Sequence, residues 1–269
     1  MSGDSADLVA DGYEAFYTAW GRSPTLRQIW RDHVTGADYP EEYAHISFVT
    51  AAQLSELTRS LSLSPGALLV DVACGAGGPG LWAAKQTGAS LIGIDLAVAA
   101  TERAAERAGP LGMEDASFQQ GTFAATGLAA ASADAVMSID ALQYVPDKSK
   151  AFAEVLRILR PGGRFAFVAF ELDPARVAGL PFWEDPVADY RPALEAAGFT
   201  TLRYEQLLGW ADQVAAGFDA ILAQRAALEA ELGTEAAAAT VMEAAVTVEL
   251  QPYCGHVFAV ATLASRADL

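Results

Sequence analysis

Unbroken apolar runs of strand length recur through the middle of the chain. ALLVDVA, SLIGIDLA, ADAVMSIDAL and GRFAFVAFE are the clearest of them. Such runs are typical of strands that are buried on both faces of a parallel sheet. Segments with helical apolar spacing separate the runs, and KSKAFAEVLRIL is one example. This alternation predicts an α/β fold with right-handed crossovers, with a ligand crevice at the carboxyl ends of the strands.

Helical spacing dominates both flanks of this region. Near the start, one helical face collects the aromatic residues Tyr13, Phe16, Tyr17 and Trp20. Toward the end, apolar spacing predicts one amphipathic helix over 211–232 and an alanine-rich second helix to about 247, and HVFAVATLA predicts a last strand. We therefore expect a helical cap over 1–60, a Rossmann-like domain over 61–210, a helical insert over 211–250 and a final core strand over 251–269.

Composition narrows the classes of partner. Acidic residues outnumber basic ones 34 to 17, and the formal net charge is −17. This charge disfavours a phosphate backbone and an anionic membrane surface, so we expect no nucleic acid and no membrane among the partners. The chain has only two cysteines, no secretory leader pattern and no transmembrane run, which predicts a cytoplasmic protein. Its histidines lack metal-ligand spacing, so no metal is predicted.

The most informative motif is GAGGPG, within VDVACGAGGPG, which matches the G-x-G-x-x-G pattern of nucleotide-binding turns. Asp95 follows Gly75 by twenty residues, the distance expected of an acid that binds ribose hydroxyls. Asp71 precedes the turn and would repel a pyrophosphate but favour an ammonium or sulfonium cation. A long helical segment also precedes the first strand, which is unusual for a nicotinamide domain. An NAD-dependent oxidoreductase nevertheless remains an alternative.

Five successive segments together resemble a known family. VDVACGAGG, IGIDLA, FQQGTF, ADAVMSIDALQYVPD and EVLRILRPGGRFAFVAFE are similar to the ordered motifs of class I S-adenosylmethionine-dependent methyltransferases, particularly those of bacterial secondary metabolism that act on small molecules. The resemblance covers about 60–171. It implies a seven-stranded sheet, mostly parallel with an antiparallel last strand, and helices on both faces. It also implies S-adenosyl-L-methionine as the cofactor and a small, largely apolar molecule as the methyl acceptor.

The same resemblance implies a cofactor site. Ala73 stands where many relatives have glycine, and an alanine is tolerated there if φ is negative. Thr122 stands where relatives commonly have aspartate, and a neutral hydroxyl is a weaker acceptor than a carboxylate. The implied cofactor-binding residues are Asp71, Ala73, Gly75 and Gly77 at the methionine end, Asp95 at the ribose, Leu96, Gly121, Thr122 and Phe123 around the adenine, and Ile139 and Asp140 at the amino group.

The catalytic residues are less defined. Some relatives carry a histidine after the fourth strand as general base, whereas this chain has Gln143 and Tyr144 there, and neither is a base at neutral pH. The remaining candidates for a base are Asp140, Glu171 and His45. The missing histidine leaves open a natural-product cyclase or a silent binding module on the same fold. We expect a monomer or homodimer, with substrate contacts from Tyr17, His45, Gln143, Tyr144 and Trp183.

Overall fold

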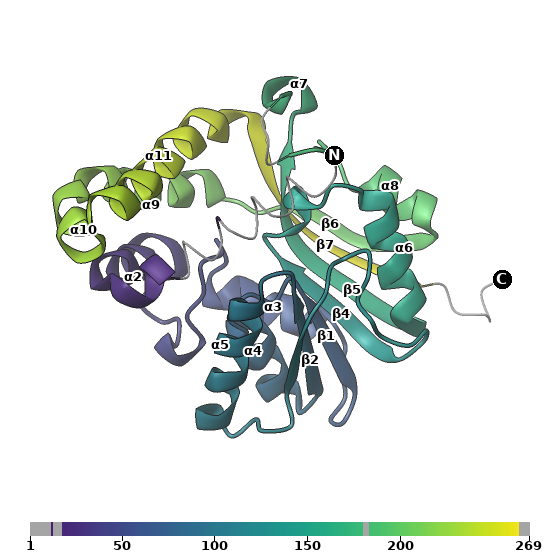
Figure 1. Cartoon of the computed structure of the whole chain (residues 1–269). Helices are drawn as coiled ribbons and strands as arrows, with labels where there is room; N and C mark the ends of the chain where they lie inside the picture. Colours follow the sequence, from purple (N-terminus) through teal and green to yellow (C-terminus); the bar gives the residue numbers. More distant parts are fainter. Residues whose placement is uncertain (1–11, 13–17, 180–182, 264–269) are drawn as a thin grey trace.

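The computed structural model describes residues 12, 18–179 and 183–263. A seven-stranded sheet with the order β3-β2-β1-β4-β5-β7-β6 forms its centre (Figure 1). Strands β1 to β5 run parallel, and β7 runs antiparallel to both β5 and β6, which confirms the predicted sheet. The strands are β1 Leu68–Val72, β2 Ser90–Asp95, β3 Ser117–Gln120, β4 Ala133–Ile139, β5 Leu159–Leu172, β6 Phe199–Gln206 and β7 Cys254–Leu263.

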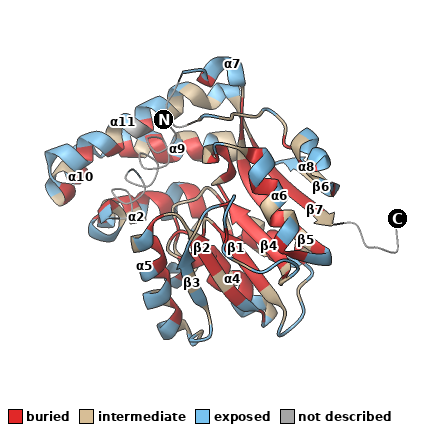
Figure 2. Cartoon of the chain, turned by 45° about the vertical axis from the view of Figure 1, so that its right-hand side comes forward, coloured by how far each residue is buried: buried red, intermediate tan, exposed pale blue. Residues whose placement is uncertain are grey.

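Helices cover both faces of the sheet because the central strands are apolar on both sides. In β1, Leu69 belongs to the core cluster on one face, and its neighbour Val70 belongs to the cluster on the other. Figure 2 shows the resulting continuous buried band along the sheet. The first face is covered by α3 (Ala51–Ser60), α4 (Gly78–Thr87) and α5 (Val98–Ala108), and the second by α6 (Lys148–Ile158) and α8 (Arg191–Ala197).

A helical cap lies beyond the carboxyl edge of the sheet (Figure 1). Its apolar core unites residues from both ends of the chain, including Leu26, Trp30 and Phe218. Of the predicted aromatic stripe, Trp20 packs edge to face on Trp30 at 5.7 Å between ring centroids, and Tyr13, Phe16 and Tyr17 lie outside the described residues. The cap comprises α2 (Pro24–Trp30), the π-helical turn Arg31–Thr35, α9 (Trp210–Ala223), α10 (Arg225–Leu232) and α11 (Thr234–Leu250).

The prediction of one helix over 211–232 is wrong, because α9 ends at Ala223 and α10 begins at Arg225. The break at Gln224 redirects the chain so that Leu228 and Leu232 are buried in the cap core, while Leu222 stays 36% exposed. Tertiary packing thus overrides a continuous helical pattern. None of the helices in the described part of the chain combines the length and apolar content needed to cross a membrane.

Short elements complete the connections. They are the 3₁₀ turns Glu41–Tyr43, Gly109–Leu111, Leu142–Tyr144 and Gln251–Tyr253, and the helix α7 (Pro174–Val177). The first of these turns lies in the N-terminal segment, which crosses the amino end of α4. The other functionally important turn, Leu142–Tyr144, directly follows the carboxyl end of β4.

Candidate functional site

The glycine-rich turn connects β1 to α4 in a left-handed backbone conformation. Ala73, Gly75 and Gly77 have φ values of 59°, 53° and 77°. The condition under which an alanine is tolerated at position 73, a negative φ, is therefore not met. The chain reverses directly after β1, with the Cys74 N–H donating to the Ile94 carbonyl at 3.0 Å, and this path requires a left-handed residue. An alanine there carries a strain of about 1 to 2 kcal/mol.

Asp95 ends β2 with its carboxylate against this turn. Its Oδ2 accepts the Gly75 N–H at 2.8 Å, and its Oδ1 accepts the Ala97 N–H at 2.9 Å. Burial raises the pKa of Asp95, and the backbone hydrogen bonds oppose that shift. Each carboxylate oxygen has two lone pairs, so both oxygens retain acceptor capacity for a ligand hydroxyl. The predicted ribose-binding acid thus lies directly beside the glycine turn.

Asp71 lies beneath α4. A Cβ atom added to Gly80 would meet Asp71 Oδ2 at 2.5 Å, so only glycine fits beside this carboxyl group. Burial and the neighbouring Asp95 raise the pKa of Asp71 well above its usual range, while a hydrogen bond from the Gly80 backbone opposes the shift. The carboxyl group therefore caps an amide in the first turn of α4, and a cation bound nearby would favour its ionised form.

The N-terminal segment lies on the amino end of α4. A Cβ atom on Gly78 would clash with the Tyr43 carbonyl, and the Arg107 guanidinium donates to the Ala44 carbonyl at 2.8 Å. The buried His45 follows, and its Nδ1 accepts the Ser47 N–H at 3.1 Å. Burial lowers the pKa of His45 to about 4. The ring is therefore neutral, with its proton on Nε2, and His45 can serve a ligand as a donor.

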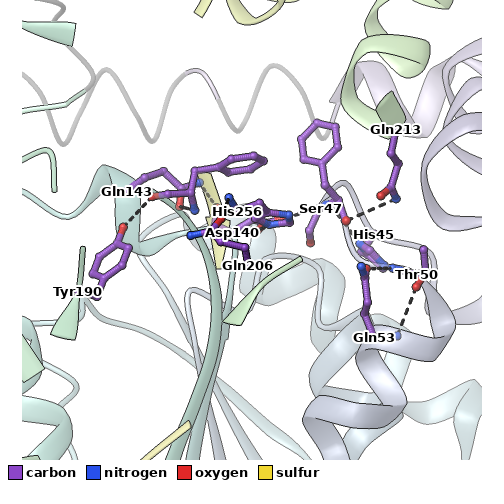
Figure 3. Close-up of polar contacts among 12 residues, drawn as sticks. His45, Ser47, Thr50, Gln53, Asp140, Gln143, Tyr190, Gln206, Gln213 and His256 are labelled. Carbon is purple, nitrogen blue, oxygen red and sulfur yellow. Dashed lines mark hydrogen bonds and ion pairs between the residues drawn. The ribbon is translucent and has the colours of Figure 1, made fainter. Parts of the chain in front are cut away.

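Asp140 directly follows β4 and joins three parts of the chain (Figure 3). Its Oδ2 accepts the Phe48 N–H at 2.7 Å, and its Oδ1 lies 2.7 Å from Nε2 of His256. Like Ala73, Asp140 has a left-handed backbone, with φ of 52°. The Gln143 side-chain amide donates to the Asp140 carbonyl at 2.6 Å and accepts the Phe170 N–H at 3.4 Å. Gln143 thereby bridges the ends of β4 and β5.

His256 is the functional candidate that the sequence reasoning missed. It lies near the start of β7, paired with Phe170 of β5, and is fully buried. Its ring stacks on the Phe170 ring with centroids 4.2 Å apart and planes 12° apart, and the Trp210 ring lies edge-on at 5.9 Å. The direction of the last strand could have identified it. An antiparallel last strand starts at the edge of the sheet where the parallel strands end, so a residue near its start lies at that edge.

Glu171 lies near the same edge but is engaged with β6. The Tyr204 hydroxyl donates to one carboxylate oxygen and the Gln206 side-chain amide donates to the other. Glu171 also pairs with Gly255 of β7. Its carboxylate is thus satisfied within the sheet, whereas Asp140 is turned toward the cap segments.

The other predicted site residues fall into three groups. The Gly121 N–H donates to the Asp95 carbonyl at 2.9 Å, which places the segment after β3 beside Asp95. Phe123 and Ile139 are buried in the core clusters, and Thr122 is exposed. Leu96, Tyr144 and Trp183 are half-buried, and Tyr17 lies outside the described residues.

Comparison with known proteins agrees with this geometry. Residues 70–167 match the family model of a methyltransferase domain. The chain is 31% identical over 199 residues to 2-methyl-6-phytyl-1,4-hydroquinone methyltransferase of Synechocystis sp., covering 68% of this chain and 57% of that protein. It is 29% identical over 181 residues to 27-O-demethylrifamycin SV methyltransferase of Amycolatopsis mediterranei, covering 67% and 64%. It thus spans less than two thirds of either relative.

A solved structure extends the likeness across the chain. The [4+2]-cyclase SpnF superposes with a TM-score of 0.75 over 97% of both chains, at 19% identity. At that identity the likeness concerns the fold alone. The domain match covers β1 to β5 and the glycine turn, and the curated relatives are methyltransferases. Residues 70–167 therefore form a methyltransferase domain, on the fold that S-adenosylmethionine-dependent methyltransferases share.

Proposed function

We propose that this protein binds S-adenosyl-L-methionine and transfers its methyl group to a small, largely apolar molecule, a natural product. The observation that carries the proposal is the carboxylate of Asp95, which the Gly75 N–H holds against the glycine turn at 2.8 Å. An acid in that position provides acceptors for two ribose hydroxyls. The two relatives named above, which act on a phytyl hydroquinone and a rifamycin, support the substrate class.

The residues at the turn fit this cofactor. Gly75 adds no side chain to the turn, and Asp95 retains lone pairs for hydroxyl groups. Gly77 is required by packing, because a Cβ atom there would lie 2.9 Å from the Cβ atom of Ala104. Asp71, a buried acid with a raised pKa, is stabilised in its ionised form by a cationic ligand and destabilised by a pyrophosphate. When bound, the cofactor supplies a methyl group on a positively charged sulfur. This preference for a cation favours S-adenosylmethionine over NAD.

The remaining predicted contacts become part of the proposal. In it, Leu96 and the segment after β3 contact the adenine, and Ala73, Ile139 and Asp140 contact the methionine portion. Phe48, Phe170 and Trp210 lie between the sheet and the cap, and rings at this junction suit an apolar acceptor. The cap excludes water from the reaction, which strengthens electrostatic interactions within the site.

The same proposal covers the location, oligomeric state and domain organisation of the protein. In this proposal the protein is a cytoplasmic monomer or homodimer, and its formal charge of −17 disfavours binding to nucleic acid or to an anionic membrane. The domain assignment is a cap over 1–60, a cofactor domain over 61–210, a helical insert over 211–250 and a final strand over 251–269. Sedimentation measurements would determine the oligomeric state.

Calorimetry with S-adenosylhomocysteine and with NAD tests the cofactor assignment. We expect the first to bind and the second not to bind. Asp95→Ala should weaken S-adenosylhomocysteine binding by about 1 to 3 kcal/mol, because two hydroxyl hydrogen bonds to a charged acceptor are lost. Asp115→Ala, at an exposed position, is the matched control. Thermal melts of both variants establish that they are folded.

Two results would count against the assignment: NAD binding without S-adenosylhomocysteine binding, and unchanged affinity in the Asp95 variant. Turnover is measured separately, as S-adenosylhomocysteine released in the presence of a panel of phenols, amines and isoprenoids. A product that is an isomer of its substrate, formed without release of S-adenosylhomocysteine, would instead indicate a cyclase.

A further inference from the structure

All three bases that the sequence suggested already accept hydrogen bonds within the chain. Both carboxylate oxygens of Asp140 accept hydrogen bonds, from the Phe48 N–H and from His256. Both oxygens of Glu171 accept donors from β6. His45 uses the lone pair on Nδ1 to accept the Ser47 N–H. A buried nitrogen that accepts no hydrogen bond within the described residues is a further candidate for the proton acceptor.

The imidazole ring of His256 provides such a nitrogen. Its Nε2 lies 2.7 Å from a carboxylate oxygen of Asp140, so Nε2 carries the proton and donates it. In the neutral ring the lone pair then lies on Nδ1. This nitrogen is buried and has no hydrogen-bond partner among the residues that the structure describes. A buried, unpartnered ring nitrogen is costly unless a ligand donates to it.

The surroundings hold the ring in this state. The Phe48 N–H orients the Asp140 carboxylate, and the Phe170 ring covers one face of the imidazole at 4.2 Å. A carboxylate on one ring nitrogen and an open lone pair on the other is the arrangement of a histidine that acts as general base. His256 also lies at the carboxyl edge of the sheet, on the strand next to β5.

We propose that Nδ1 of His256 is the general base, that Asp140 is its positioning residue, and that the methyl acceptor is a phenolic hydroxyl. The inference rests on the proposed function. As the acceptor oxygen forms its bond to the methyl carbon, the O–H bond breaks and its proton passes to Nδ1. The electron pair of the carbon–sulfur bond stays on sulfur. The imidazolium, stabilised by Asp140, then releases the proton to solvent.

A phenol fits this base better than the other acceptor classes. Carboxylates arrive deprotonated and need no base. A phenol, with a pKa of about 10, gives up its proton far more readily than an aliphatic alcohol does, so a single neutral imidazole can accept that proton as the new bond forms. The rings of Phe48, Phe170 and Trp210 surround the dyad and suit an aromatic acceptor. Asp140 contacts the His256 ring directly, and Glu171 accepts a hydrogen bond from Gln206, whose side-chain oxygen accepts the His256 backbone N–H.

The first test needs no substrate. Nitrogen NMR of the ¹⁵N-histidine-labelled full chain reports which ring nitrogen carries the proton, and His256→Gln identifies the signal. We expect Nε2–H with an unprotonated Nδ1. In Asp140→Asn, the fixed Phe48 N–H takes the amide oxygen and the amide NH₂ faces His256, so the proton should move to Nδ1. A wild-type ring protonated on Nδ1, or an Asn variant that retains Nε2–H, would overturn the proposal.

The second test measures turnover of a phenol that the wild type methylates. His256→Gln should lower kcat about 10²- to 10⁴-fold, leave S-adenosylhomocysteine affinity unchanged, and make the rate rise with pH as hydroxide replaces the base. His33→Gln, at an exposed histidine, should match the wild type. A His256→Gln kcat within threefold of wild type would overturn the proposal. So would methylation of amines or carbon acceptors but no phenol, an outcome that leaves the proposed methyltransferase function intact.

Discussion

At the scale of single residues, two of the four non-glycine residues with positive φ in the described part of the chain lie at the carboxyl ends of β1 and β4. Ala73 and Asp140 both have a left-handed backbone, with φ of 59° and 52°. Non-glycine residues in this region cost energy and persist only where the surroundings hold them, most often at functional sites. The identities of these residues could not predict this, because alanine and aspartate normally adopt negative φ. The strain comes from the turns that follow, which bring each strand end to the cofactor or to His256.

His45 should make folding stability depend on pH. Its pKa falls from 6.5 in the unfolded chain to about 4 in the folded one because of burial. Between those values only the unfolded chain binds the proton, so stability falls as pH falls through this window. From about pH 6.5 to pH 5, the free energy of unfolding should drop by roughly 1.5 kcal/mol more in the wild type than in His45→Gln. Urea denaturation measures the difference.

Other titrating groups contribute equally to both proteins, so their effects cancel in the difference between wild type and His45→Gln. Asp71 is one such group, because its raised pKa makes the protein less stable as pH rises. Measurements stay above the sequence pI of about 4.4 to keep the protein soluble. His33→Gln should follow the wild-type profile because its imidazole is exposed. Parallel profiles for the wild type and His45→Gln would show that the His45 ring is not held neutral.

At the scale of elements, periodicity predicted most helices and strands correctly. The continuous runs around Leu69 and Val136 became central parallel strands, since only strands buried on both faces lack polar alternation. The long helix predicted over 211–232 failed at Gln224, where no glycine or proline marks the break. The break depends on cap packing, which sequence spacing does not encode.

The amino end of α3 offers a test at this scale. The Thr50 hydroxyl accepts the Gln53 N–H at 3.3 Å, and the Gln53 side chain accepts the Thr50 N–H at 2.8 Å, a reciprocal capping box. Thr50→Ala removes one acceptor and should lower the free energy of unfolding by about 1 kcal/mol in denaturant titration. Thr50→Ser keeps the hydroxyl and should stay close to wild type. Equal losses in the two variants would assign the effect to the lost methyl group.

At the scale of the whole molecule, charge opposes compaction. The formal net charge is −17, and surface ion pairs such as Arg225 with Glu229 are solvent-exposed and contribute little. Added salt should therefore weaken the repulsion among acidic residues more than it weakens the attraction within ion pairs. Raising sodium chloride from about 0.05 M to about 0.5 M should increase the melting temperature by a few degrees. Choline chloride at the same concentration should raise the melting temperature equally. A melting temperature that falls with added salt would show that the ion pairs outweigh the net repulsion.

The sequence by itself determined the local structure. Apolar periodicity, the glycine turn and the acid twenty residues after Gly75 were sufficient for the sheet, for most of the helices and for the place of the Asp95 carboxylate beside the turn, because each depends on residues close together or on strand ends that meet at one edge. Only the tertiary structure paired Asp140 with His256, 116 residues away, and engaged Glu171 with β6. Such contacts depend on strand direction and cap packing, and these decide which polar groups are satisfied and which nitrogen keeps its lone pair.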